Sequence, residues 1–309
     1  YQDADTAFNS EKSALDDQNE TASTYYKLLT QKEWDFALIE NPEKADAADA
    51  KGYLEETLPE EAKADFQKEF VPHAWQTYRN ADKTFKYFDE AIYTNSIYPW
   101  GSAQGNTIEY DDPQAPTHYN PVGYYRTEFE LPENWDGRKV FLSLQSVRSA
   151  YYLFINGKQV GYTADSFTAH DFNITPYLNK NGKNTIALKV YRWGIGSYLE
   201  NQDMWWFAGI IRDVSLIRRP KHHMLDWRIV SDLVMEQNET TGKICLDAVF
   251  ENHTEDETAL TVEMEVMDGE QVIFSESREI SGKKGETEYV TEVILENIKP
   301  WSAEYPELY

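Results

Sequence analysis

The feature that most constrains this chain is a two-residue alternation of apolar and polar side chains between residues 122 and 295. In GYYRTEFEL (123–131), Tyr125 and Phe129 alternate with Glu128 and Glu130. In LTVEMEV (260–266), the alternation is unbroken. Successive side chains of a β-strand point to opposite faces, so this pattern predicts strands with one buried and one solvated face.

The turn residues between these runs indicate antiparallel pairing. Asn156-Gly157 separates the apolar runs YYLFI and KQVGY, which is the strongest short-range indication of a β-hairpin. Before Pro220 the predicted strands are short and separated by turn clusters, which favours a two-sheet sandwich of jelly-roll type. After it, longer alternating runs are separated by Gly269, Gly282 and Gly285, which is typical of an immunoglobulin-like sandwich.

We therefore expect an all-β protein with two domains. Residues 1–220 form a jelly-roll domain with an N-terminal extension, and residues 221–309 form an immunoglobulin-like domain. Residues 221–224 are interpreted as a linker. The second domain is slightly shorter than the about 100 residues typical of its fold, so we expect it to be truncated at its C-terminal end. The Ala-, Glu-, Asp- and Lys-rich stretch 41–69 predicts a connection with short helical turns.

Charge and composition exclude several classes of partner. The net charge is −25, from 54 acidic against 29 basic residues. Such a chain does not suit a phosphate backbone or an anionic membrane surface, whereas a neutral sugar is not penalised. No apolar run approaches the roughly 20 residues that span a bilayer. We expect no nucleic acid and no membrane partner, and a cytoplasmic location, with a secreted or cell-surface location as the alternative.

Cysteine and histidine give no recognisable metal motif. Cys245 is the single cysteine, so an internal disulfide is impossible, and no Cys/His zinc spacing is present. The six histidines are scattered. The one adjacent pair, His222-His223, is interpreted as part of the linker rather than as a metal site.

One polar loop carries an unusual number of aromatic residues. The segment 191–213 reads YRWGIGSYLENQDMWWFAGIIRD and places Trp193, Trp205 and Trp206 near Asp203. Aromatic faces beside a few fixed oxygens suit a sugar, whose ring faces are apolar and whose rim carries hydroxyls. The alternative is that these tryptophans cover the end of a sandwich. In DEAIYTNSIYPW (89–100), aromatics similarly flank Asn95, which is otherwise a common turn residue.

The order of motifs resembles the N-terminal part of a glycoside hydrolase family 2 β-galactosidase. The resemblance covers nearly the whole chain beyond about residue 20. Its motifs are VPHAW (71–75), IYTNSIYP (92–99), GYYRTEFELPENW (123–135), FINGKQVGY (154–162), YRWGIGSYLENQDMW (191–205), GIIRDVSL (209–216) and WSAEYPELY (301–309). The QDMW and IYTN motifs favour the β-galactosidase branch over β-glucuronidases and β-mannosidases.

The resemblance implies a sugar-binding jelly-roll domain, then an immunoglobulin-like domain, then a TIM barrel that this sequence lacks. It implies retaining hydrolysis of terminal β-galactosides by two glutamates of that barrel, so no catalytic residue is expected here. It also implies that Asn95 reaches the galactosyl group and that Asp203 ligates sodium and meets the sugar 6-hydroxyl. Magnesium belongs to the intact enzyme, with no ligands in this chain, and intact relatives are often homo-oligomers.

Two departures from the family pattern stand out. Trp206 and Phe207 occupy positions where the family often has Arg and an aliphatic or aromatic residue. The stretch 28–36 (LLTQKEWDF) lacks the usual Asn-Gly turn. Two rival functions also fit the residues: a stand-alone carbohydrate-binding module, and a structural or adhesion sandwich with core tryptophans. For a sugar site we expect Asp203 to be partly exposed, and we expect that the three loop tryptophans are not all exposed.

Overall fold

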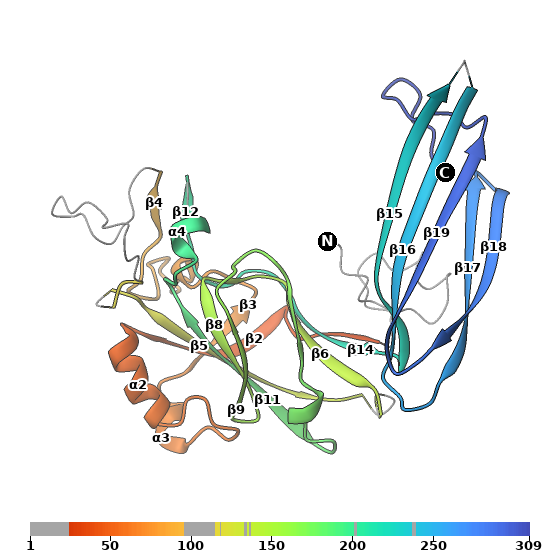
Figure 1. Ribbon diagram of the computed structural model, residues 1–309. Helices are drawn as coiled ribbons and strands as arrows, with labels where there is room; N and C mark the ends of the chain where they lie inside the picture. Colours follow the sequence, from red (N-terminus) through yellow and green to blue (C-terminus); the bar gives the residue numbers. More distant parts are fainter. Residues whose placement is uncertain are drawn as a thin grey trace. The chain divides into compact units, whose positions relative to one another are not determined.

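The computed structural model describes residues 25–95, 115–117, 119–132, 135, 137–200, 203–236 and 239–309 (Figure 1). The described chain is mostly antiparallel β-structure and divides into two compact units, with the boundary between Arg218 and Arg219. None of the helices in the described ranges is both long and apolar enough to cross a membrane.

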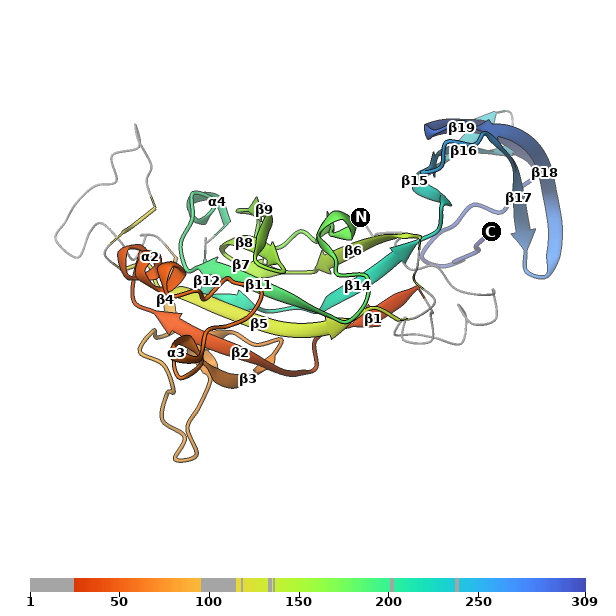
Figure 2. The same cartoon turned by 90° about the horizontal axis from the view of Figure 1, so that it is seen from below.

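The first unit is a sandwich of two antiparallel sheets, as the alternation predicts (Figures 1 and 2). The larger sheet contains, in spatial order, β3 (Gln67–Val71), β2 (Lys32–Ile39), β5 (Val122–Glu130), β11 (Lys183–Tyr191), β8 (Ala150–Ile155) and β9 (Lys158–Thr163). The smaller sheet contains β1 (Tyr26–Leu28), β14 (Val214–Arg219), β6 (Lys139–Leu144) and β10 (His170–Asn173). Short 3₁₀ turns, η1 (Trp75–Thr77) and η3 (Thr175–Tyr177), lie in the connections.

The core of this unit lies between the two sheets and is rich in aromatic residues. Phe36 packs against Tyr125, with ring centroids 4.6 Å apart, and against Trp75 at 6.2 Å. The predicted inward positions of β11, Ile186, Leu188 and Val190, are fully buried in the same cluster. Burial of a large apolar side chain contributes about 1.5–3 kcal/mol, so this cluster is the main stabilising element of the unit.

The outer face of the larger sheet is also covered, which the strand pattern did not predict. Helices α2 (Pro42–Ala50) and α3 (Glu60–Lys63) contribute Ala45, Ala48 and Ala62 to a second cluster against this face. The α2 helix begins favourably, because the Asn41 side chain accepts a hydrogen bond from the Lys44 N–H at 2.9 Å.

Because the helices cover this face, two basic residues that were expected to be solvated are buried. Arg126 and Lys189 lie on the face predicted to be polar, yet both are buried. Arg126 donates to the Tyr53 and Glu55 carbonyls at 2.7 Å each, and Lys189 pairs with Asp49 at 2.6 Å. The alternating pattern was right about which face each residue occupies. It was wrong about solvation, because a separate segment folds over that face.

The predicted hairpin is confirmed at residues 156–157. Asn156 (φ 50°) and Gly157 (φ 74°) both adopt positive φ, as a type I′ turn requires, and they join β8 to β9. A Cβ atom at Gly157 would lie 2.9 Å from the Glu56 backbone nitrogen. Position 157 therefore needs glycine both for its backbone conformation and for the close approach of the segment around Glu56.

A fully buried ion pair links several distant segments of this unit. Arg192 pairs with Asp89, and both side chains are fully buried. Asp89 also accepts hydrogen bonds from the Trp75 indole at 2.6 Å, the Gln76 amide at 2.9 Å and the Tyr119 hydroxyl at 2.5 Å. The Gln76 side-chain oxygen in turn accepts a 3.0 Å bond from the Ala208 N–H.

The second unit is an immunoglobulin-like arrangement of two small sheets. One sheet contains β15 (His222–Glu236), β16 (Glu239–Asn252) and β19 (Gly285–Glu296), and the other contains β17 (Thr258–Asp268) and β18 (Gln271–Gly282). The predicted alternation is confirmed in β17, and the buried apolar side chains of the unit include Ala248, Val266, Tyr289 and Val293. Residues 297–309 form no helix or strand.

The interpretation of residues 221–224 as a linker is wrong for His222 to Met224. These residues begin β15 and pair with Asn252 to Phe250 of β16. The pair His222-His223 looks like a linker in sequence because it is polar and because the end of a strand can be polar too. Pairing with β16, which no local pattern reveals, makes these residues part of the sheet.

We expect Asp89→Asn to destabilise the first unit by about 3–5 kcal/mol, because it leaves the Arg192 guanidinium buried without its counter-charge. Thermal unfolding followed by circular dichroism measures this loss. Glu90→Gln is the matched control, since it removes the same charge from the adjacent, exposed side chain. The control should change stability by no more than about 0.5 kcal/mol. Equal melting temperatures for the two variants would contradict a stabilising role of the Asp89–Arg192 ion pair.

Candidate functional site

Two of the loop tryptophans, Trp205 and Trp206, lie on a short two-stranded ribbon, and Asn95 directly follows its other strand. The strands β4 (Ile92–Thr94) and β12 (Met204–Trp206) pair antiparallel, with Tyr93 opposite Trp205 (Figure 1). Because side chains alternate along a strand, Tyr93 and Trp205 share one face, and Ile92 and Trp206 share the other. The ribbon therefore has an outer and an inner face with different environments.

The outer face presents an exposed aromatic surface. Tyr93 and Trp205 are 50% and 53% exposed, and their rings lie 5.7 Å apart. Phe207 stacks on Trp205, with centroids 6.0 Å apart and an interplanar angle of 16°. Large aromatic side chains held in this way offer an apolar surface for a flat ligand face.

The two residues singled out from the sequence flank this surface. Asn95 directly follows β4, Asp203 directly precedes β12, and both are exposed. Continuing the observed register by one residue places Asn95 opposite Asp203, on the face that carries Tyr93 and Trp205. The expectation that Asp203 is at least partly exposed is met.

A cross-strand hydrogen bond fixes Asp203. The Tyr93 hydroxyl donates to Asp203 Oδ1, and this bond raises the pKa of Tyr93. A carboxylate has about four acceptor positions on its two oxygens, so one hydrogen bond leaves most of its capacity available for a ligand. The same bond also braces the ribbon, which gives Asp203 a structural role beside any role in binding.

The inner face of the ribbon is part of the protein interior. Trp206 and Trp193 are 1% and 3% exposed and meet edge to face, with centroids 5.2 Å apart. Trp193 is further held by Asn120, which accepts from its backbone N–H at 2.9 Å and donates to its carbonyl at 3.0 Å. The expectation that the three loop tryptophans are not all exposed is confirmed. At position 206, where the family often has Arg, this chain has a core aromatic.

Two arginines that were not predicted as functional hold the ribbon in place through hydrogen bonds to its backbone carbonyls. Arg148 donates to the Trp205 carbonyl at 3.2 Å, and its guanidinium lies 4.9 Å from the Phe167 ring centroid. Arg192 donates to the Trp206 carbonyl at 3.3 Å and to the Glu90 carbonyl at 3.0 Å. Neither position is recognisable from sequence, because an arginine in a strand (Arg148) or directly after one (Arg192) normally indicates a solvated side chain.

After the ribbon, close packing around residue 209 requires a glycine. Gly209 begins the short strand β13 (Gly209–Ile210), which pairs with β7 (Val147–Arg148). A Cβ atom at Gly209 would lie 2.6 Å from the Tyr125 hydroxyl oxygen, and the residue has φ 125°. On the other side, α4 (Ser197–Glu200) is tied down by Glu200, which accepts from the Ser166 N–H at 2.8 Å.

The chemistry available on the outer face is binding rather than catalysis. An amide both donates to and accepts from hydroxyls, a carboxylate accepts from hydroxyls or ligates a hard cation, and the aromatic rings cover an apolar face. Retaining glycoside hydrolysis needs two carboxyl groups about 5–5.5 Å apart. The set formed by Tyr93, Asn95, Asp203 and Trp205 contains one carboxylate, so this set by itself does not supply that pair.

Comparison with known proteins identifies the family of this chain. The family model described as "Glycosyl hydrolases family 2, sugar binding domain" matches residues 28–220, and that described as "Glycosyl hydrolases family 2" matches residues 222–309. A β-galactosidase of Priestia megaterium is 35% identical over 291 residues, which cover 93% of this chain and 26% of that protein. A β-galactosidase of Clostridium acetobutylicum is 36% identical over 222 residues, covering 72% of this chain and 23% of that protein.

Among solved structures, β-glucuronidase 2 of Bacteroides uniformis is similar in fold, with a TM-score of 0.65 at 20% identity, covering 91% of this chain and 29% of that chain. The chain thus spans about a quarter of the length of the curated relatives it matches. The first described unit largely coincides with the sugar-binding region and the second with the region after it, with boundaries that agree to within a few residues. The chain belongs to glycosyl hydrolase family 2, of which it carries the sugar-binding jelly-roll domain and the immunoglobulin-like domain that follows.

Proposed function

We propose that this chain is the N-terminal, non-catalytic portion of a β-galactosidase that hydrolyses terminal β-D-galactosides with retention. In this proposal the β4–β12 ribbon contributes Asn95 and Asp203 to the galactose subsite. The observation that supports the proposal is the ribbon register: continued by one residue beyond the Thr94–Met204 pair, it sets the exposed Asn95 opposite the exposed Asp203. The catalytic glutamates belong to a barrel outside this sequence.

The choice of galactoside rests on the relatives with the higher identity. The two β-galactosidases named above are 35% and 36% identical to this chain. The β-glucuronidase structure is similar in fold at 20% identity, which supports the fold but not the substrate. The IYTN and QDMW motifs, which contain Asn95 and Asp203, favour the same choice.

Asp203 is proposed to supply one ligand of a sodium ion. An exposed carboxylate suits a hard cation, but such a cation takes six or so oxygen ligands. The chain therefore contributes only part of that site, and the remaining ligands come from the barrel and from water. We propose no magnesium ligand in this chain. We also propose that the intact enzyme is a homo-oligomer.

The 309-residue chain by itself should not cleave a chromogenic β-galactoside, because retaining hydrolysis needs two suitably spaced carboxyl groups. The purified chain is assayed at substrate concentrations that saturate family 2 β-galactosidases. Turnover that survives further purification, and that disappears when one acid of this chain is changed, would overturn this expectation.

In a full-length enzyme that contains this chain, Asp203→Ala should lower kcat/KM by roughly 10- to 100-fold, because it removes a charged hydrogen-bond acceptor for the sugar. The melting temperature should change little, because Asp203 is exposed. Both quantities are measured on the same preparation.

Tyr93→Phe is the matched control for this substitution. It removes the Tyr93–Asp203 hydrogen bond and keeps the carboxylate. If Asp203 acts on the sugar, Tyr93→Phe retains most of the activity. If Asp203 only braces the ribbon, the two variants lose stability equally and keep a normal kcat/KM per folded molecule, and the assignment is then rejected.

Substitution of the neighbouring residues Trp206 and Trp205 should affect different quantities: stability for Trp206 and KM for Trp205. Trp206→Ala empties a buried position and should cost about 3–5 kcal/mol of stability. Trp205→Ala removes an exposed ring, so the melting temperature should stay nearly constant while the KM for a galactoside rises. Chemical denaturation and steady-state kinetics separate the two. A large stability loss from Trp205→Ala would show that this ring is structural.

The rival function, a stand-alone carbohydrate-binding module, differs in the affinity it requires. A subsite that is completed by a barrel should bind galactose only at millimolar concentration or more weakly, which corresponds to about 4 kcal/mol or less. Ligand-observed NMR with methyl β-D-galactoside measures this on the 309-residue chain. Micromolar binding would favour the module instead.

A further inference from the structure

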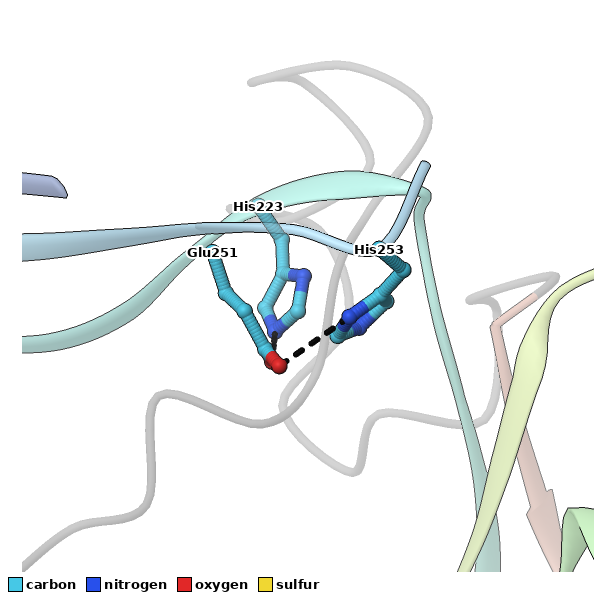
Figure 3. A group of neighbouring side chains, drawn as sticks. All are labelled: His223, Glu251 and His253. Atoms are coloured by element: carbon cyan, nitrogen blue, oxygen red, sulfur yellow. Dashed lines mark ion pairs between the residues drawn. The ribbon is translucent and has the colours of Figure 1, made fainter. Parts of the chain in front are cut away.

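Strand pairing in the second unit brings together two histidines and a glutamate. His223 of β15 lies directly opposite Glu251 of β16, so both side chains share one face of the sheet. His253 follows Glu251 by two positions and therefore lies on the same side. Figure 3 shows the three side chains converging from the two strands. Their ligand atoms all lie within 4.8 Å of one another.

The spacing of these atoms is close to that of a zinc site. Glu251 Oε1 lies 3.0 Å from His253 Nδ1, and Glu251 Oε2 lies 3.6 Å from His223 Nε2. Ligands bound tetrahedrally at about 2.0–2.1 Å from zinc are roughly 3.3–3.4 Å apart. These two separations bracket that value, and the full set of ligand atoms lies within 4.8 Å, so the side chains must draw somewhat closer together to bind an ion.

The local environment keeps His223 ready to bind. Both ring nitrogens of His223 are buried, and Nε2 faces the Glu251 carboxylate at 3.6 Å.

The segment that carries His253 is held rigidly. The His253 N–H donates to the Lys221 carbonyl at 3.0 Å, which fastens the start of β15 to the end of β16. The buried Asn252 side chain donates to the Asp256 and Gly282 carbonyls at 2.8 and 2.9 Å. A preorganised backbone reduces the entropy lost when the ligands are fixed around an ion.

We propose that His223, Glu251 and His253 form a binding site for a divalent transition metal, with Zn²⁺ as the best match. Two imidazoles and one carboxylate leave the fourth tetrahedral position for water or another donor. Nitrogen ligands disfavour Ca²⁺ and Mg²⁺, so this site differs in chemistry from the sodium ligand proposed at Asp203. The ion would join the first residues of β15 to the end of β16.

The neighbouring His222 provides a matched control. It lies opposite Asn252, on the other face of the sheet, and its Nε2 is 3.1 Å from the Thr258 hydroxyl. Calorimetric titration of the 309-residue chain with ZnCl₂ should give one site per chain. His223→Gln, Glu251→Gln and His253→Gln should each weaken it at least about tenfold, whereas His222→Gln should leave it unchanged. Absence of zinc binding, or equal binding by all four variants, would overturn the proposal; the latter indicates an adventitious ion only.

A second measurement needs no substitution and remains decisive if a variant fails to fold. Long-range ¹H–¹⁵N spectra of the imidazoles report which of the six histidines binds zinc. Signals of His223 and His253 should shift on addition of one equivalent, and those of His222 and His170 should not. Replacing zinc with Co²⁺ should give the intense visible absorption of a tetrahedral complex. Zinc shifts at other histidines, or none at His223, would reject the site.

Discussion

The buried pair of Asp89 and Arg192 is the interaction on which the first unit depends. Removing two charges from water is costly, and mutual attraction offsets this only when the remaining donors and acceptors are also satisfied. Here Trp75, Gln76 and Tyr119 complete the coordination of Asp89. The pair therefore fixes segments that are far apart in sequence, and a single change at either charge would leave the other buried alone.

Arg192 of this pair also anchors the proposed binding ribbon. Arg192 donates to the carbonyls of Glu90 and Trp206, which adjoin β4 and end β12 respectively. The inner tryptophans, Trp193 and Trp206, then pack against the protein interior, while Trp205 remains exposed. Rigid support beneath an exposed aromatic face is what a sugar subsite needs, because little freedom is lost when the ligand binds.

The second unit shows how strand register can assemble a site from unremarkable residues. His223 belongs to β15, Glu251 lies near the end of β16, and His253 directly follows that strand. A shift of one residue would turn His223 to the other face and replace it with His222 or Met224. The proposed metal site thus depends on the same pairing that builds the sheet, and binding an ion would in turn stabilise that register.

The sequence by itself determined the all-β class, the jelly-roll followed by an immunoglobulin-like unit, and the hairpin at Asn156-Gly157. These features follow from two-residue alternation and turn chemistry, which are local properties. The motifs around Asn95 and Asp203 also pointed to the family. Only the tertiary structure decided that Arg126 and Lys189 are buried, because a helical segment elsewhere in the chain covers them. Likewise, Tyr93 and Asp203 lie 110 positions apart, and only strand pairing brings them into contact. The physical reason is that solvation and juxtaposition depend on what packs across each face, and no local pattern encodes that.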